Sequence, residues 1–219
     1  MGFFWNKKAG IDAVIIPDFG WPKETAGKSK IQWSNTEQAM SLSVNFIKME
    51  PDIPTLKDIE QIRNLYRKMV HEANGGIIEV ELVELKTILC VRLLIKIPQS
   101  PTGMTYIGSL TIPFKNCSYV LKVQAFEVGI TGMRDAVILD KLLAKKVASL
   151  EKGVLKGWFF DPYESKPSGT TLLMNRSESL EYDADFPGHP LTRVREKLKI
   201  IESTIEFKKE IFDLKKFEK

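Results

Sequence analysis

Apolar and polar residues alternate along several short stretches of the chain, a pattern typical of β-strands that bury one face. In one of these stretches, Met40, Leu42, Val44 and Phe46 fall on one face, whereas serines and an asparagine fall on the other. Another stretch is almost uniformly apolar, which indicates a strand in the middle of a sheet. The strands are expected at residues 12–17, 40–48, 77–84, 87–97, 104–113 and 118–128.

Other segments carry apolar residues at the spacing of an amphipathic helix. Helices are expected at residues 56–73, at 132–150 and from Pro190 onward. Thr55 is a candidate N-cap for the first helix, and Gly153 and Gly157 are expected to end the second. Pro190 suits the first turn of the last helix, whose helical stripe is expected to continue through residues 206–219.

These elements predict an α+β fold with a central antiparallel meander, helices packed on its faces and a C-terminal helical extension. The meander follows from the short connections between the four strands of residues 77–128. A chain of 219 residues can bury a sizeable core without disulfides or metal, so we expect one domain over 1–219. Its core would span about 12–150, followed by an irregular segment and the last helix in 151–219.

The order of elements over residues 12–150 resembles the Mog1/PsbP-like fold, with strands, a helix, a four-stranded meander and a helix after Thr131-Gly132-Met133-Arg134. Members of that group are mostly accessory or adaptor proteins, so the resemblance implies binding to another protein rather than catalysis. Residues 182–195 also resemble a segment of uncharacterised bacterial proteins, which implies a bacterial source but no function.

Composition and charge are those of an ordinary globular protein. Hydrophobic residues make up 43% and charged residues 27% of the chain, and the net charge is +4. The densest basic segment, Lys141–Lys156, is interpreted as the solvated face of a helix, with a phosphate-binding patch as the alternative. Nucleic acid is therefore not an expected partner.

Cysteine content and the lack of long apolar runs point to a cytoplasmic location. Residues 1–8 lack an apolar stretch of the length that a signal peptide needs, so none is expected, and no apolar run is long enough to span a membrane. Cys90 and Cys117 both lie in expected strands, so each is predicted to be a buried, reduced thiol.

Two histidines limit the catalytic options, and the common nucleotide, metal and nucleophile motifs are absent. His71 lies at the end of the first helix, where an imidazole interacting with the helix terminus is expected. Asp183, Asp185 and His189 lie within seven residues and could hold a divalent metal or form an acid–base pair. The other interpretation is that the acids cap the last helix or pair locally.

Arg193 and Arg195 complete this candidate functional loop, and we expect one of them to pair with Asp183 or Asp185. On this second interpretation, no catalytic residue, metal or cofactor is assigned. A cleft converging on His189 with shifted pKa values would instead favour an enzyme.

Six apolar residues are candidates for partner binding, namely Trp158, Phe160, Phe207, Ile211, Leu214 and Phe217. The aromatic run at 158–160 could instead belong to the core or add an edge strand. The four residues of the C-terminal stripe could dock on the chain's own domain or on a partner.

The sequence therefore favours a non-enzymatic bacterial accessory factor that binds another protein: an adaptor, a chaperone-like factor or a toxin-immunity protein. The alternative is a small metal-dependent or acid–base hydrolase that uses Asp183, Asp185 and His189.

Overall fold

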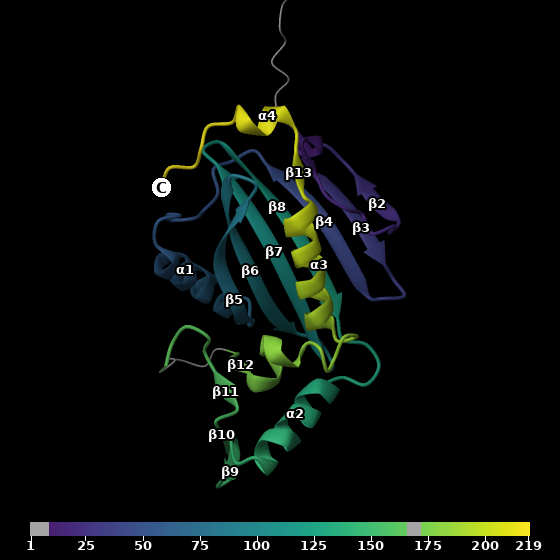
Figure 1. The fold of residues 1–219 in the computed structure, drawn as a ribbon, viewed down its shortest axis with the longest axis vertical. Helices are drawn as coiled ribbons and strands as arrows, with labels where there is room; N and C mark the ends of the chain where they lie inside the picture. Colours follow the sequence, from purple (N-terminus) through teal and green to yellow (C-terminus); the bar gives the residue numbers. More distant parts are fainter. Residues whose placement is uncertain (1–8, 166–171) are drawn as a thin grey trace, which may run out of the picture.

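A computed structural model describes residues 9–165 and 172–219, so residues 1–8, for which no signal peptide is predicted, lie outside it. The described chain is an α+β protein built on a seven-stranded antiparallel sheet, as the sequence predicts (Figure 1). The sheet strands are β2 (Lys23–Ala26), β3 (Lys30–Asn35), β4 (Met40–Ile47), β5 (Gly76–Leu85), β6 (Ile88–Pro98), β7 (Met104–Phe114) and β8 (Cys117–Phe126). The helices are α1 (Ile59–Glu72), α2 (Met133–Ala144), α3 (Pro190–Thr204) and α4 (Lys209–Phe212).

The sheet order is β2-β3-β4-β8-β7-β6-β5, so the predicted meander of β5 to β8 is confirmed. The N-terminal strands β2, β3 and β4 extend the sheet beyond β8, because β4 pairs with β8 along its whole length. The hairpin of β2 and β3 is not among the strands expected from the sequence. β2 is exposed throughout, so it carries no hydrophobic alternation that would reveal it.

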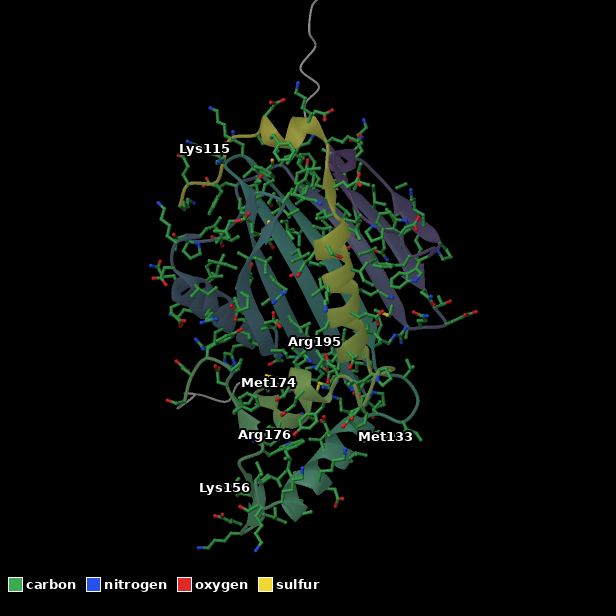
Figure 2. The ribbon with its side chains drawn as sticks, in the orientation of Figure 1. Lys115, Met133, Lys156, Met174, Arg176 and Arg195 are labelled. Carbon is green, nitrogen blue, oxygen red and sulfur yellow. The ribbon has the colours of Figure 1, made fainter. Side chains whose placement is uncertain are left out.

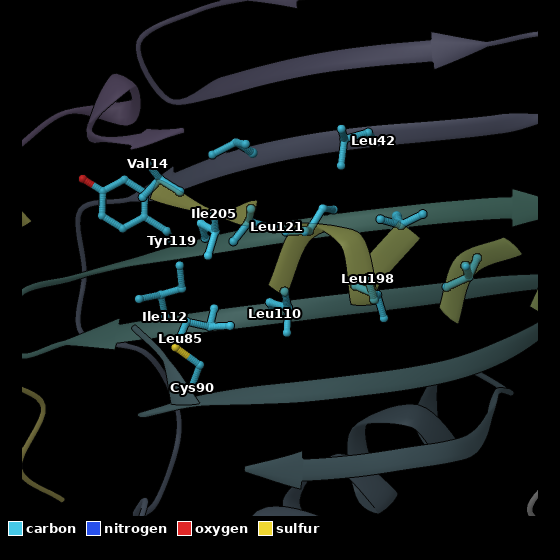
Figure 3. Close-up of a cluster of buried hydrophobic side chains, with 14 of the residues drawn as sticks. Val14, Leu42, Leu85, Cys90, Leu110, Ile112, Tyr119, Leu121, Leu198 and Ile205 are labelled. Atoms are coloured by element: carbon cyan, nitrogen blue, oxygen red, sulfur yellow. The ribbon is translucent and has the colours of Figure 1, made fainter. Parts of the chain in front are cut away.

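Helices pack on both faces of the sheet. α3 lies across β7 and β8, and Figure 3 shows Leu198 and Ile205 against Leu110 and Leu121. Gly108 allows this close approach, because a Cβ there would lie 2.5 Å from a methyl carbon of Leu198. α1 packs at the β5 edge on the opposite face, where its apolar side chains form a separate small core with β5 and β6.

Two predicted helix limits are wrong. α1 begins after Asp58, not Thr55, and the Asp58 carboxylate accepts hydrogen bonds from the backbone N–H groups of Glu60 and Gln61. α2 ends at Ala144 rather than at residue 150. Lys146 has a φ of 56°, which stops a helix. The basic segment then continues as a hairpin of β9 (Ser149–Glu151) and β10 (Val154–Lys156), so it is not one helical face.

The C-terminal helix is confirmed as α3, but the helical stripe expected through residues 206–219 is not one helix, because only α4 is helical there. Ile205 is extended, and β13 (Glu206–Phe207) pairs with β1 (Val14–Ile15). α4 and an extended tail then cross the end of the sheet, where Lys216 bridges to Phe114. We call residues 206–219 the C-terminal strap.

Candidate functional site

Charged side chains gather beneath the sheet, where the ends of β6 and β7 meet α2 and the start of α3. Two single-turn helices, at Arg176–Glu178 and Leu180–Tyr182, bring the chain past this point. Figure 2 shows Arg195 at this end of the sheet, on the first turns of α3. We call this group the buried polar cluster; its members are Lys96, Tyr106, Arg134, Glu178, Asp183 and Arg195.

Lys96 and Glu178 form the innermost part of the cluster. Their Nζ and Oε2 atoms are 2.7 Å apart, and the side chains are only 2% and 1% exposed. The Glu178 carboxylate also accepts hydrogen bonds from the Asn175 backbone N–H at 2.8 Å and from the Tyr106 hydroxyl at 3.3 Å. Burial raises the pKa of Tyr106 well above its usual range, and the nearby Glu178 charge adds to the effect.

Asp183 lies between two guanidinium groups. Arg134 and Arg195 each donate to Asp183 Oδ1 at 2.9 Å. Arg134 is fully buried, and it also donates to the carbonyl oxygens of Ser177 and Ser179. Burial lowers the pKa of Arg195, while Asp183 acts in the opposite direction. The expected pairing of one of the two loop arginines with a loop acid is therefore present.

Arg134 was not predicted as a member of the site. It is the second residue of α2, a position where a charged side chain is normally solvated. Arg134 lies in the segment Thr131–Arg134 at the start of the expected helix, but no sequence pattern there distinguishes a buried arginine from an exposed one.

His189, and not an acid, caps α3. Its Nδ1 accepts a hydrogen bond from the Leu191 backbone N–H at 3.2 Å, and its Nε2 lies 3.5 Å from Glu127. Glu127 also accepts from the backbone N–H groups of Met104 and Gly132. Burial alone would raise the pKa of Glu127, but the hydrogen bonds from His189 and the two backbone groups outweigh it and lower this pKa.

The three residues of the possible hydrolase site occupy different surroundings. Asp183 is held by arginines, His189 uses both ring nitrogens in local contacts, and Asp185 forms an exposed ion pair with Lys141 at 3.3 Å. Within residues 9–165 and 172–219, no three His, Cys, Asp or Glu side chains are grouped so as to hold a metal ion. His71 is exposed at the end of α1.

A hollow of about 310 Å³ opens beside His189. Its rim is formed by apolar side chains from the end of β8, the following loop and the start of α2, and Figure 2 labels Met133 at this point. We call this set the apolar rim; it consists of Phe126, Val128, Ile130 and Met133. Three of the four are more than half exposed: Ile130 at 79%, Val128 at 68% and Met133 at 53%.

Arg193 provides the remaining charge at the hollow. Its guanidinium donates to the backbone carbonyl of Gln38 at 3.0 Å and to the side-chain oxygen of Gln38 at 2.7 Å. It forms no ion pair with any carboxylate of the described chain. Burial lowers the pKa of Arg193, and the negative charge of Glu196 offsets only part of this decrease.

The residues that sequence alone suggests for partner binding lie against the chain's own domain. Trp158 is buried in a small core with α2, and Phe160 belongs to β11 (Phe159–Phe160), which pairs with β12 (Met174–Asn175). Ile211 is fully buried, and Phe207, Leu214 and Phe217 are partly buried. Binding of a partner through any of the six stays a prediction.

No protein-family model matches the sequence, and no curated protein is significantly similar to it. Among solved structures, the chain is similar to the Ran-binding protein Mog1p of Saccharomyces cerevisiae, with 11% identity and a TM-score of 0.35, over 59% of this chain and 74% of that one. A Pseudomonas aeruginosa protein of unknown function, PA94, described as a putative regulator, matches with 8% identity and a TM-score of 0.31, over 67% and 85%. A Bacteroides thetaiotaomicron protein matches with 11% identity and a TM-score of 0.33, over 64% and 44%. A Mog1 protein thus stands among the similar structures, as the element order predicts, but similarity at this level does not extend to function.

None of the helices in the described part of the chain has the length and apolar character that crossing a bilayer requires. Cys90 and Cys117 are buried and are not joined in a disulfide, as predicted.

Proposed function

We propose that the protein is a non-enzymatic accessory factor of the bacterial cytoplasm that binds another protein through the apolar rim. Such a factor would be an adaptor, a chaperone-like factor or a toxin-immunity protein. The proposal is carried by one observation: Val128, Ile130 and Met133 are exposed together around a hollow. Exposed apolar residues are unremarkable one by one, but a contiguous group beside a hollow is typical of a protein-binding surface.

The charge at the hollow indicates the chemistry of the partner. Arg193 is half-buried and has only neutral oxygen atoms as hydrogen-bond partners. A guanidinium forms its strongest contacts with a carboxylate, often in a bidentate pair. The partner segment is therefore expected to place an apolar side chain in the hollow and an acidic side chain next to Arg193.

The hollow beside His189 is also the feature that would favour a hydrolase, so the surroundings of His189, Asp183 and Asp185 bear on the choice between the two functions. A general base needs a free ring nitrogen, but both nitrogens of His189 face partners in the described chain. Asp183 is neutralised by two arginines and lies in the buried polar cluster, and Asp185 is paired with Lys141. This arrangement supports a structural role for the loop and a binding role for the surface beside it.

The test compares what two variants retain. The tagged native protein, Ile130→Glu and Leu150→Glu are used to capture proteins from a lysate of the source organism. Leu150 is the matched control, because it is also an exposed aliphatic residue but lies on the distant β9–β10 hairpin. A protein that is retained by the native chain and Leu150→Glu, and lost by Ile130→Glu, is the expected result.

The captured protein is then purified and titrated against the same variants. Removing a central apolar contact of an interface typically costs about 2 kcal/mol, so Ile130→Glu should weaken binding roughly 30-fold. Arg193→Gln should weaken it less and should reduce its dependence on salt, because one charge pair is lost. Equal binding by the native chain and Ile130→Glu would show that the rim is not the binding surface.

A further inference from the structure

A second cavity, of about 470 Å³, lies at the other end of the sheet, beneath the C-terminal strap. Figure 1 shows the strap crossing that end of the sheet, far from α2. The cavity walls are mostly apolar. Ile211, Leu214 and Phe217 of the strap face Ile88, Leu89 and Phe114 of the sheet.

The strap is fastened on both sides of this cavity by backbone hydrogen bonds. The Lys115 N–H donates to the Lys215 carbonyl at 3.0 Å, and the Leu56 N–H donates to the Lys219 carbonyl at 2.9 Å. The cavity is therefore preformed, and its size falls in the range of small-molecule sites, about 300–1,000 Å³. Among its lining residues, Leu89 is 38% exposed and Phe212 is 56% exposed, so apolar surface remains available to a ligand.

Cations dominate the charged residues at the cavity. Lys57, Lys216 and Lys219 contribute to its lining, against the single acid Glu218. Lys57 donates to the Glu218 carbonyl oxygen, and Lys219 pairs with Glu50 outside the cavity. Lys216 takes part in no ion pair with the described residues.

We propose that this cavity binds a small anionic amphiphile, with the chemistry of a medium-chain fatty carboxylate. The alkyl chain would lie between the strap and the sheet, and the carboxylate would pair with Lys216. An apolar wall with a basic edge fits this ligand better than it fits a polar metabolite, which would find few hydrogen-bond partners, or a hydrocarbon, which would leave the lysine unused. The proposal does not depend on the partner-binding role of the apolar rim.

The first test titrates saturated carboxylates, from octanoate to tetradecanoate, into the 219-residue chain by calorimetry, at concentrations below micelle formation. Saturable binding of one ligand per chain is expected. Burying a methylene group is worth about 0.8 kcal/mol, so affinity should rise roughly fourfold per added carbon and then level off when the cavity is full. Dodecanol should bind about fivefold more weakly than dodecanoate, because it cannot pair with Lys216.

Two variants locate the binding. Leu89→Trp fills the cavity from a half-exposed wall position and should weaken dodecanoate binding at least tenfold. Lys216→Glu should weaken dodecanoate binding about fivefold or more but leave dodecanol binding unchanged. The matched controls, Leu150→Trp and Lys152→Glu, lie on the distant β9–β10 hairpin and should bind as the native protein does.

Circular dichroism and thermal melting establish that each variant is folded, and Lys216→Glu tests the site even if Leu89→Trp does not fold. Three results would overturn the proposal: no saturable binding of any carboxylate, affinity that rises with chain length without levelling off, or native-like binding by Lys216→Glu. If the carboxylates fail and an apolar peptide binds instead, the cavity is a protein-docking site and the proposed ligand is wrong.

Discussion

Replacing Lys96 with methionine should destabilise the protein strongly, because it leaves a buried carboxylate without its cation. Methionine keeps most of the length of the lysine side chain, so the change removes charge rather than volume. Removing one partner of a buried pair typically costs about 3–5 kcal/mol. Glu178 retains the hydrogen bonds from the Asn175 N–H and the Tyr106 hydroxyl, which places the expected loss near the lower limit, about 3 kcal/mol.

A loss of about 3 kcal/mol would be a large part of the 5–15 kcal/mol that stabilises a typical domain. For a chain of this size, it corresponds to a fall in Tm of roughly 6–12 °C. Urea unfolding followed by circular dichroism gives the free energy from the midpoint and the slope, and an unchanged slope shows that the unfolded state is not altered.

Glu178→Gln and the double variant complete a thermodynamic cycle. If the ion pair is the interaction being removed, the double variant should lose at least about 2 kcal/mol less than the sum of the two single losses. Lys141→Met is the matched control, because the ion pair of Lys141 with Asp185 is half exposed and should contribute less than about 0.5 kcal/mol. A loss below 1 kcal/mol for Lys96→Met, or additive losses in the cycle, would refute the reasoning.

Three further predictions concern the site and the core. His189→Ala should lower the free energy of unfolding by about 1–2 kcal/mol in urea, through loss of the α3 cap. Asp183→Asn should lower it by about 3 kcal/mol, because the buried Arg134 and the largely buried Arg195 lose their counter-ion. Loss of an enzymatic activity in His189→Ala at unchanged Tm would instead support the hydrolase. Cys90, whose pKa burial raises to about 12, and Cys117, whose pKa burial also raises, should both react slowly with a polar thiol reagent in native protein, and rapid labelling would contradict their burial. Since the folded-state pKa of Glu127 is lowered, its contribution to stability is present above about pH 4.3 and is lost as the pH falls through the lowered value, so Glu127→Gln should flatten that part of a stability–pH curve.

Hydrophobic periodicity is sufficient to predict the strands that bury one face. The alternation of Met40, Leu42, Val44 and Phe46 correctly places β4, and the short connections after Gly76 correctly predict the meander. The same signal cannot detect β2, which buries nothing, or the end of α2, which depends on the left-handed conformation of Lys146. Local pattern therefore predicts the sheet and the helix faces, while single backbone conformations decide where the elements stop.

In the candidate site, contacts between residues close in sequence could be predicted, whereas contacts made by distant segments could not. Residues 183–189 lead directly into α3, whose first turns carry Arg193 and Arg195. The pairing of Asp183 with Arg195 is therefore a local contact that the sequence can suggest. The second arginine comes from α2, 49 positions from Asp183. The apolar rim comes from the end of β8, the following loop and the start of α2. These contributions could not be predicted because they depend on how α2 packs beneath the sheet.

The buried polar cluster and the apolar rim are linked through the first turn of α2. Met133 belongs to the rim, and Arg134, the next residue, is anchored by Asp183 and by two backbone carbonyls. Well-packed apolar residues often replace buried ion pairs without loss of stability, so stability alone is a weak reason for so many charges in one place. The contacts of Arg134 with Asp183 and with two backbone carbonyls restrict the position of the α2 N-terminus. The cluster therefore holds the start of α2, and with it the rim, in one orientation relative to α3, which is the requirement for a preformed binding surface.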